Sequence, residues 1–304
     1  MGQESGKYIL SGASGMLGGA LRTALAERGA SFLQLVRKSP ASAAQLLWNP
    51  SGSPFVESLE ALDGCAAAVH LAGANVAAQR WSPAYRRAMT DSRVDTTHAL
   101  ASVLAGLRQP PKALLVASAV GIYGDRGDEL LDESSTAGCG FLAELCQQWE
   151  AAAQPAVDAG IRVVHLRLGV VLGPGGGALA KMLPLFRLGL GGRIGNGQQW
   201  MSWISLHDAV GAMLFALETL PLKGAVNLTA PTPVTNATFT RTLAGKLRRP
   251  AFLPAPAIAL RLAFGQMADE TLLASARVIP KRLLDAGFDF THRTVGEALA
   301  AALA

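Results

Sequence analysis

Cysteine is scarce in this sequence, which has three among 304 residues: Cys65, Cys139 and Cys146. Their spacing fits neither a metal site nor a disulfide framework, so we expect a protein of the reducing cytoplasm. The sequence also lacks an uncharged apolar run of membrane-spanning length, and its polar first residues lack the pattern of a signal peptide. These absences argue against a disulfide-stabilised secreted domain and a membrane protein, and they predict no metal site.

Charged residues make up only 16% of the chain and aromatic residues 6%, with a formal net charge of +5. The basic residues are dispersed, aromatic side chains are not interleaved with them, and no recognition motif is present. We therefore expect no nucleic-acid partner and no membrane partner, and the positive charge suits small anionic ligands better. A chain of this length can hold one large domain, or a large and a small one, with an ample core.

A glycine-rich segment at residues 12–18 has the spacing G-x-x-G-x-x-G and follows a short apolar run, residues 8–10. Leu17, Leu21 and Leu25 then recur at helical spacing, and a second apolar run follows at residues 32–36. Glycines in such a strand-to-helix turn let the backbone approach a pyrophosphate, whose charge the helix N–H groups hold. The predicted cofactor-binding residues of the turn are Gly12, Ser14, Gly15, Met16, Leu17 and Gly18.

The end of the second predicted strand indicates which dinucleotide is bound. NAD sites usually place an acidic residue there for the ribose 2′-hydroxyl, whereas NADP sites place a cation for the 2′-phosphate. This chain has Arg37 and Lys38 at that point and no carboxylate between Gly29 and Glu57. A solvated basic pair is the simpler alternative, but arginine is well suited to phosphate recognition. We therefore predict NADP as the cofactor.

Strand and helix patterns alternate as far as about residue 220, which predicts an α/β fold with a doubly wound parallel sheet covered by helices on both faces. One long helical pattern is expected to end at Pro110, and residues 141–157 are expected to be mostly helical. Beyond residue 230, prolines separate short helices. We expect a dinucleotide-binding domain over residues 7–220, with cleft segments at 174–203, and a smaller C-terminal α/β lobe over residues 221–304 that serves as a substrate or lid lobe.

The motifs together resemble one known family. They are residues 12–18, 71–73, 92–93, 118–124, 149–150, 167–173, 191–203 and 278–288, with Trp81. This set is similar to the extended short-chain dehydrogenase/reductases, and in particular to an atypical epimerase-family subgroup with a C-terminal domain of unknown function. The resemblance implies a Rossmann-type NADP-binding domain, a small-molecule substrate and a monomer or homodimer. It also places five further residues near the cofactor: Leu71, Ala72, Gly73, Arg93 and Val171.

The resemblance allows a specific prediction for Arg93. The resemblance makes it a cofactor-facing residue, whereas the alternative is a surface arginine in a local ion pair. We expect its replacement by alanine to weaken NADPH binding with little effect on the stability of the protein without cofactor.

The catalytic set of short-chain reductases is incomplete in this chain. These enzymes use a Tyr as acid/base, a Lys four residues later and a Ser that orients the carbonyl. Alignment through residues 149–150 puts Phe141 at the Tyr position and Leu145 at the Lys position. Tyr123 and Ser118 are then the candidate catalytic residues, although Tyr123 is equally interpreted as a structural hydrogen-bonding residue. Ser118 is better interpreted as a turn hydrogen bonder than as a nucleophile.

Other chemistry-bearing residues have weaker support. His207 and Asp208 open a helix that closes the substrate cleft in this fold, although such an Asp is usually only a dipole partner. Nothing in their spacing selects Glu133 or Glu144, and Trp200 and Trp203 line a pocket or form a core pair. Two functions remain open: an NADP-dependent oxidoreductase or epimerase with a rearranged acid/base set, and a non-catalytic NADP-binding regulatory or scaffold protein.

Overall fold

Short apolar runs become the strands of one parallel sheet in the computed structural model, which describes residues 6–50, 52 and 55–304. The strand order is β11-β7-β5-β4-β1-β2-β3. The strands are β1 (Lys7–Ser11), β2 (Ser31–Val36), β3 (Gln45–Leu47), β4 (Ala67–His70), β5 (Ala113–Ala119), β7 (Arg162–Leu168) and β11 (Gly224–Leu228). All pairings are parallel, as the alternating pattern predicted.

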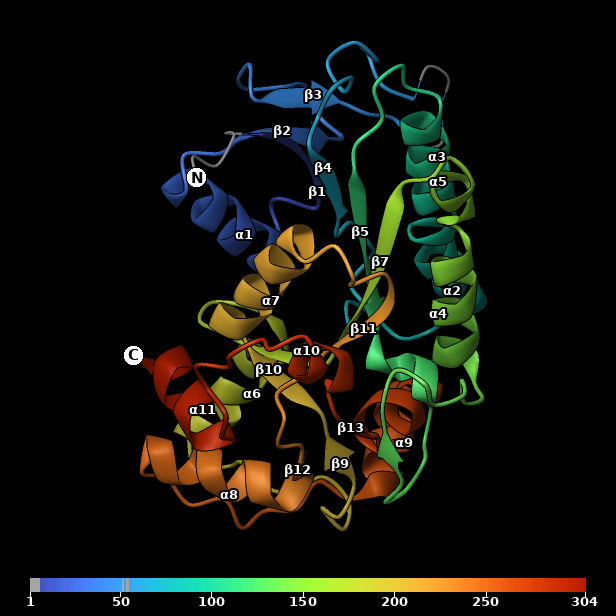
Figure 1. The fold of residues 1–304 in the computed structure, drawn as a ribbon. Helices are drawn as coiled ribbons and strands as arrows, with labels where there is room; N and C mark the ends of the chain where they lie inside the picture. Colours follow the sequence, from blue (N-terminus) through green and yellow to red (C-terminus); the bar gives the residue numbers. More distant parts are fainter. Residues whose placement is uncertain (1–5, 51, 53–54) are drawn as a thin grey trace.

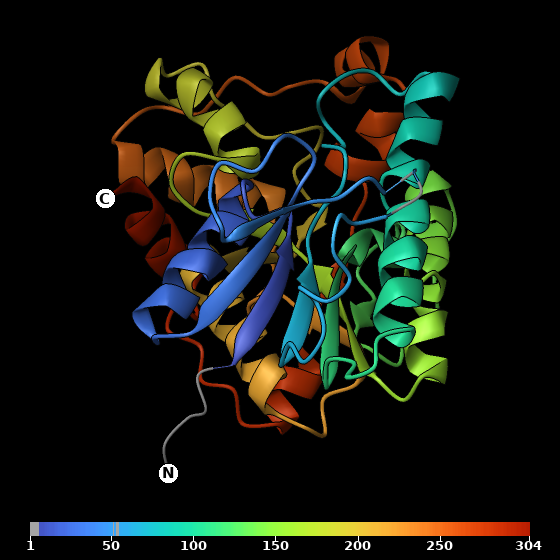
Figure 2. The same cartoon turned by 90° about the horizontal axis from the view of Figure 1, so that it is seen from above.

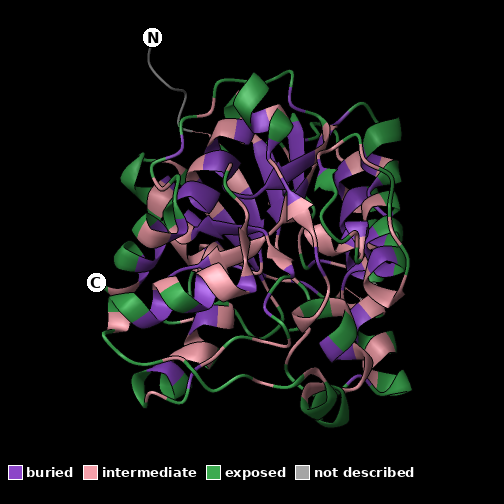
Figure 3. Ribbon diagram, turned by 90° about the horizontal axis from the view of Figure 1, so that it is seen from below, coloured by how far each residue is buried: buried purple, intermediate pink, exposed green. Residues whose placement is uncertain are grey.

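Helices cover both faces of the sheet, which explains why its central strands are apolar at almost every position. On one face lie α1 (Met16–Glu27) and α7 (Leu206–Glu218), and on the other lie α3 (Val94–Ala105), α4 (Phe141–Ala151) and α5 (Gln154–Asp158) (Figure 1). Figure 2 shows the strands from above between these two helical layers. Buried residues concentrate in the strands and on the inward helix faces, whereas the outer helix faces are exposed (Figure 3). The predicted α/β doubly wound architecture is therefore confirmed.

Two of the expected helical segments are interrupted. The long helix expected before Pro110 is divided into α2 (Pro83–Asp91) and α3, with Ser92 and Arg93 between them. The expected helical stretch at 141–157 consists of α4 and α5, separated by Ala152 and Ala153. At the break between α2 and α3, Arg93 turns inward and donates to the main chain of the loop after β4.

The rest of the chain forms small two-stranded pairs and helices beside the carboxyl ends of the sheet strands (lower half of Figure 1). The pairs are β8 (Val170–Leu172) with β10 (Trp203–Ser205), β9 (Trp200–Met201) with β12 (Val234–Thr235), and β6 (Leu130–Leu131) with β13 (Arg277–Val278). The helices are α6 (Gly177–Arg187), α8 (Asn236–Leu247), α9 (Ala257–Phe264), α10 (Lys281–Asp285) and α11 (Val295–Leu303).

The predicted division at residue 220 falls just before β11, which pairs with β7 as an edge strand of the main sheet. A separate core joins α6, α8 and α11 through residues such as Leu179, Phe239 and Leu299. The domain division stays a prediction, and we propose that the smaller lobe starts after Leu228 and includes the segment around α6. Among the described residues, none of the helices has the length and apolarity needed to span a bilayer.

Candidate functional site

The glycine turn between β1 and α1 is shaped by close main-chain contacts. Gly12 has φ of +71°, and a Cβ there would lie 2.7 Å from the carbonyl carbon of Leu71 and 2.8 Å from the nitrogen of Ala72. A Cβ on Gly18 would lie 2.3 Å from the Gly12 oxygen. Gly12 therefore permits both the turn and its contact with the loop after β4, and Gly18 permits α1 to pack tightly against the turn.

Gly15 differs from these two glycines, because a Cβ there would meet no atom of the chain nearer than the Gly12 oxygen at 3.4 Å. Ser14 and Gly15 are exposed. Gly15 is the N-cap of α1, and it has no side chain that could accept hydrogen bonds from the first N–H groups of the helix. The first turn of α1 contains no acidic residue. Neither a side-chain cap nor an acidic residue of the first turn therefore compensates the positive end of this helix dipole, which suits an anion.

A second glycine-rich loop, residues 173–177, lies against the start of α1. A Cβ on Gly176 would lie 3.0 Å from the sulfur of Met16, and one on Gly177 would lie 3.4 Å from the Val171 oxygen. The structure thereby brings together Met16 and Val171, two of the residues predicted to contact the cofactor. Leu71 and Ala72 lie against Gly12 on the other side of the turn.

The basic pair predicted to select NADP lies at the same edge of the sheet. Arg37 and Lys38 follow β2, whose residues pair in register with β1 as far as Ser11 and Leu35. Both side chains are exposed, and neither makes a hydrogen bond or ion pair within the described part of the chain. The pair is therefore available to an anionic ligand that extends from the glycine turn.

A buried histidine forms hydrogen bonds beside the glycine turn. His70 ends β4 opposite Ser11, and its Nδ1 lies 2.5 Å from the Ser11 hydroxyl while its Nε2 lies 3.2 Å from the Thr96 hydroxyl. Burial lowers the pKa of His70 to about 4. The ring is consequently neutral near pH 7 and links β1, β4 and α3 as a structural group.

Arg93 is buried rather than on the surface, with 8% of the residue exposed. Its guanidinium donates to the Ala74 oxygen at 2.8 Å and the Met89 oxygen at 3.2 Å, and lies 5.0 Å from the centre of the Trp149 ring. A Cβ on Gly73 would come within 3.2 Å of its Cζ. The arginine thus holds the loop after β4 against α2 and α4, which is a role that the sequence did not predict.

This position changes the result expected for Arg93→Ala. Loss of two charge-assisted hydrogen bonds and the contact with Trp149 should lower the free energy of unfolding without cofactor by about 2–4 kcal/mol. Urea unfolding of the protein without ligand measures this loss. The exposed Arg87→Ala on α2 is the matched control and should change stability by less than about 0.5 kcal/mol. Equal stability of the two variants would contradict the anchoring role.

The two candidate catalytic residues belong to one buried hydrogen-bond network. Ser118 donates to Glu150 at 2.7 Å, and Arg167 binds both oxygens of Glu150 at 2.8 and 2.9 Å. Arg167 also donates to the Tyr123 hydroxyl at 3.0 Å, and that hydroxyl donates to Asn227 at 2.7 Å. The network connects β5, α4, β7 and β11, so the structure joins Tyr123 and Ser118 through groups that the sequence analysis did not select.

Burial limits what these two hydroxyls can reach. Tyr123 has no exposed surface and Ser118 has 2%. Burial raises the pKa of Tyr123 above its ordinary value, against the opposing effect of Arg167. In this structure both hydroxyls are occupied by protein partners, and their catalytic roles stay a prediction.

The vacant Tyr and Lys positions lie in an apolar cluster. Leu145 is buried with Trp81, Met89 and Met267, and the Phe141 ring packs edge-on against Trp81 at 5.3 Å. The main-chain nitrogens of Phe141 and Leu142 donate to the two carboxylate oxygens of Glu270 at 3.1 and 2.7 Å. A residue of the C-terminal lobe therefore caps α4 at the point where a catalytic Tyr would stand.

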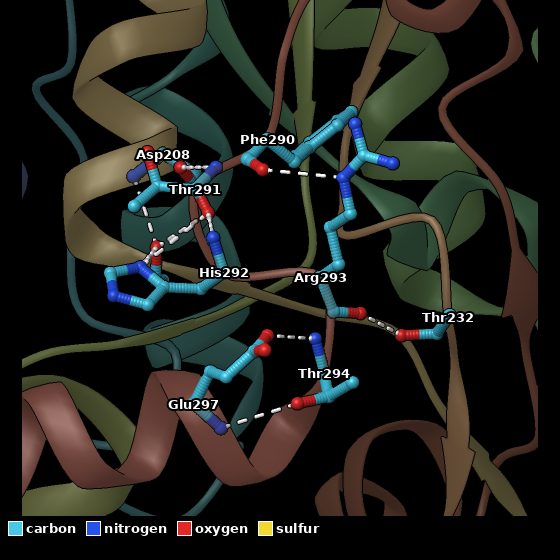
Figure 4. Close-up of polar contacts among 9 residues, drawn as sticks. Asp208, Thr232, Phe290, Thr291, His292, Arg293, Thr294 and Glu297 are labelled. Carbon is cyan, nitrogen blue, oxygen red and sulfur yellow. Dashed lines mark hydrogen bonds and ion pairs between the residues drawn. The ribbon is translucent and has the colours of Figure 1, made fainter.

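Asp208 and its neighbour His207 begin α7, as predicted, but Asp208 is buried and serves the C-terminal segment. It accepts hydrogen bonds from the Ser205 hydroxyl and from the main-chain nitrogens of Thr291 and His292, each at 2.9 Å. Figure 4 shows the segment from Phe290 to Thr294 held beside Asp208, with Glu297 at the start of α11. Nδ1 of His292 binds the Ser205 hydroxyl at 3.0 Å.

This Ser, His and Asp set is a structural clamp and not a nucleophilic triad. Ser205 and Asp208 both lie on the Nδ1 side of His292, whereas a triad places the acid and the nucleophile on opposite ring nitrogens. The Ser205 hydroxyl is also the N-cap of α7 and accepts from the Asp208 nitrogen at 3.0 Å.

The remaining candidates have structural partners or are exposed. Glu133 accepts from the Asn227 nitrogen at 2.9 Å, and burial raises its pKa. Glu144 is exposed on α4. Trp203 is fully buried, whereas Trp200 donates to Asp128 at 2.7 Å. The two tryptophans therefore do not form a common core pair.

Comparison with protein families gives two matches along the chain. Residues 8–228 match the model of the NAD-dependent epimerase/dehydratase family, and residues 255–302 match a domain of unknown function. An epimerase family protein of Mycobacterium tuberculosis is 47% identical over 290 residues, which are 95% of each chain. The human epimerase family protein SDR39U1 is 37% identical over 296 residues, covering 96% of this chain and 98% of the human protein.

Solved structures of related proteins have the same fold. A crystal structure of human SDR39U1, isoform 2, with NADPH superposes with a TM-score of 0.90 at 36% identity, covering 97% of this chain and 98% of that one. A UDP-galactose 4-epimerase superposes with a TM-score of 0.73 over 97% of each chain. At 16% identity, this second match shows the fold alone.

Proposed function

This chain belongs to the NAD-dependent epimerase/dehydratase family, and we propose that it binds NADP(H) and acts as an oxidoreductase- or epimerase-type protein on a small-molecule substrate. The observation that carries the proposal is the turn at residues 12–18. There Gly12 and Gly18 are required by close contacts within the chain, whereas Gly15 is exposed and the start of α1 has no side-chain cap. An anion suits that helix start, and the NADPH in the human relative supports a dinucleotide.

The residues proposed to hold the cofactor come from the glycine turn, the loop after β4 and strand β8. The turn residues Ser14, Gly15, Met16 and Leu17 supply main-chain N–H groups for the pyrophosphate. Leu71, Ala72, Gly73 and Val171 form the neighbouring walls, with Arg93 fixing the loop of the first three. A bound nicotinamide supplies the hydride donor or acceptor of such reactions.

The preference for NADPH over NADH can be tested by a substitution in the basic pair, Arg37 and Lys38. Arg37→Ala should weaken NADPH binding about tenfold to a hundredfold while leaving NADH affinity nearly unchanged, because a charge-assisted hydrogen bond to the 2′-phosphate is worth about 1.5–3 kcal/mol. Titration calorimetry with both nucleotides measures this difference, with Arg22→Ala as the control on the exposed face of α1. Equal affinity of the unsubstituted protein for NADPH and NADH would refute NADP as the preferred cofactor.

We propose that any catalysis does not use the Tyr–Lys pair of short-chain reductases, since Phe141 and Leu145 occupy those positions in an apolar cluster. Tyr123 and Ser118 stay the proposed acid/base candidates at the end of β5. Because both residues are buried, their main role in this structure is to hold β5, α4 and β7 in position. Glu270 is a further carboxylate that contacts the Phe141 position.

A second candidate is a non-catalytic NADP(H)-binding regulatory or scaffold protein, which the apolar packing of Phe141 and Leu145 favours. The two candidates differ in turnover. Oxidation of NADPH in the presence of aldehydes, ketones or nucleotide-sugars, at rates within the ordinary enzyme range of about 1–1000 per second, would exclude the non-catalytic protein. A cytoplasmic location, and a monomer or homodimer, stay predictions.

A further inference from the structure

A cavity of about 570 Å³ lies in the C-terminal half of the molecule, between α8 and the segment 249–254. Figure 1 shows α8 at the lower end of the molecule, well separated from α1 and the glycine turn. The cavity volume falls within the usual range for small-molecule sites, about 300–1000 Å³. The sequence analysis placed these residues in the predicted cleft segment and C-terminal lobe but assigned no individual role to any of them.

The space of this cavity is left by small residues along one face of α8. Ala237, Ala244 and Gly245 recur at helical spacing along that face, and a Cβ added at Gly245 would meet nothing within 4 Å. The opposite wall is fixed to the rest of the lobe. A Cβ on Gly192 would overlap the Leu253 carbonyl, so the chain segments around these two residues are in direct contact.

Three exposed arginines line this cavity: Arg193, Arg241 and Arg249. Arg193 and Arg249 make no side-chain hydrogen bond or ion pair within residues 6–50, 52 and 55–304, and Arg241 reaches only the Thr238 hydroxyl at 3.4 Å. No acidic residue belongs to the described lining. Mutual repulsion of like charges opposes such a cluster, and an anion with several negative charges would relieve it.

The remaining lining is apolar. Ala237, Ala244, Ala251 and Pro254 contribute to the cavity, and Phe252 stands at it with 73% of its surface exposed. An exposed aromatic ring beside basic side chains suits a ligand that has an apolar or planar part as well as a charged part. Free inorganic phosphate would use the arginines but not these surfaces.

We propose that this cavity is a second ligand site, for a molecule in which phosphate groups are attached to an apolar or planar body. The arginines bind the phosphates, because a guanidinium presents two N–H groups in the geometry that phosphate oxygens accept. Phe252 contacts the apolar part. A soluble nucleotide-like molecule and a phospholipid headgroup share this chemistry, and the experiment separates them.

The test is titration calorimetry of the full-length protein with pyrophosphate and with ATP. Arg241→Glu with Arg249→Glu should weaken pyrophosphate binding at least about tenfold, since two charge-assisted contacts become repulsive. Lys246→Glu with Arg248→Glu is the control, because it changes the net charge equally at residues outside the lining. The control should bind pyrophosphate within about threefold of the unsubstituted protein.

Because ATP can also occupy a dinucleotide site, only the binding that the Arg241 and Arg249 double variant loses is assigned to the cavity. Phe252→Ala should weaken that component for ATP about threefold to tenfold and leave pyrophosphate unchanged. ATP binding with these dependences identifies a soluble ligand. Sedimentation with phosphatidylglycerol-containing vesicles, but not with phosphatidylcholine vesicles, and with the same arginine dependence identifies a lipid headgroup. Equal losses in the two double variants, or no binding of any of these probes, would refute the site.

Discussion

Replacement of Arg167 by methionine is expected to lower the free energy of unfolding at pH 7 by about 3–5 kcal/mol. Arg167 binds both oxygens of Glu150 and also the Tyr123 hydroxyl, with side-chain exposures of 11% for the arginine and 14% for the glutamate. Methionine has a similar length without the charge, so Glu150 would remain buried as an uncompensated carboxylate. The cost arises from that unpaired charge rather than from lost packing.

The stability lost in the Arg167→Met variant should depend on pH, whereas a loss caused by altered packing would not. Burial acts to raise the pKa of Glu150, but the hydrogen bonds and charge of Arg167 outweigh it and hold this pKa below 4.5. The pair therefore stabilises the unsubstituted protein above about pH 4.5 and loses its contribution as the pH falls further. In the variant, burial is opposed only by the Ser118 hydrogen bond and the charge of His165, so the pKa of Glu150 rises and acidification from pH 7 toward 4.5 should neutralise the unpaired charge.

Urea unfolding of the unsubstituted protein and of Arg167→Met, at several pH values between 7 and 4.5, measures how their difference in stability depends on pH. The stability difference should narrow as the pH falls, and a constant difference would show that the charge of Glu150 is not its cause. Arg28→Met is the matched control, because Arg28 forms a surface ion pair with Glu218 in which both side chains are about half exposed. Its effect should be at most about 1 kcal/mol.

Replacement of Asp208 by alanine is expected to cost about 2–4 kcal/mol and to loosen the C-terminal segment. The carboxylate is 1% exposed and accepts from the Thr291 and His292 nitrogens and from the Ser205 hydroxyl. Without it, partly buried donors lose their acceptor, and the segment that leads into α11 loses its anchor on α7 (Figure 4). Hydrogen exchange should accelerate at residues 290–295 more than in β5 or β7.

Asp289→Ala is the control for this variant. Asp289 is 88% exposed and pairs with Arg293 within the same segment, so its removal should change stability by less than about 0.5 kcal/mol. Asp208→Asn retains one acceptor oxygen and should have an intermediate effect. Unchanged hydrogen exchange at 290–295 in Asp208→Ala would show that the clamp does not hold the segment.

The order of strands and helices was predictable because the hydrophobic pattern is local. The apolar run at 8–10 and the one at 32–36 each predict a strand without reference to distant residues, and both are strands in the structure. The glycine spacing at 12–18 likewise predicted the strand–turn–helix that forms there. The cofactor contacts assigned to these residues stay predictions.

The interactions that complete the candidate site could not be predicted, because their partners are far apart in sequence. Glu270 caps α4 from 129 residues away, and Asp208 binds Thr291 across 83 residues. Arg93, at the break between α2 and α3, donates to the Ala74 oxygen, and no local pattern indicates that contact. Tyr123 was interpreted equally as an acid/base candidate and as a structural hydrogen-bonding residue, and its partners Arg167 and Asn227 could not be identified from the sequence.

The cap of Glu270 on α4 has a consequence for the order of assembly during synthesis. Phe141 leaves the ribosome 129 residues before Glu270, which is roughly 6–26 s at about 5–20 residues per second. By the end of that interval all seven strands of the sheet have been synthesised, while the first N–H groups of α4 have lacked the Glu270 acceptor and β6 has no β13 beside it. A nascent chain can thus form the main sheet before α4 is capped and before β6 is paired, and a chain truncated before Glu270 would lack both contacts.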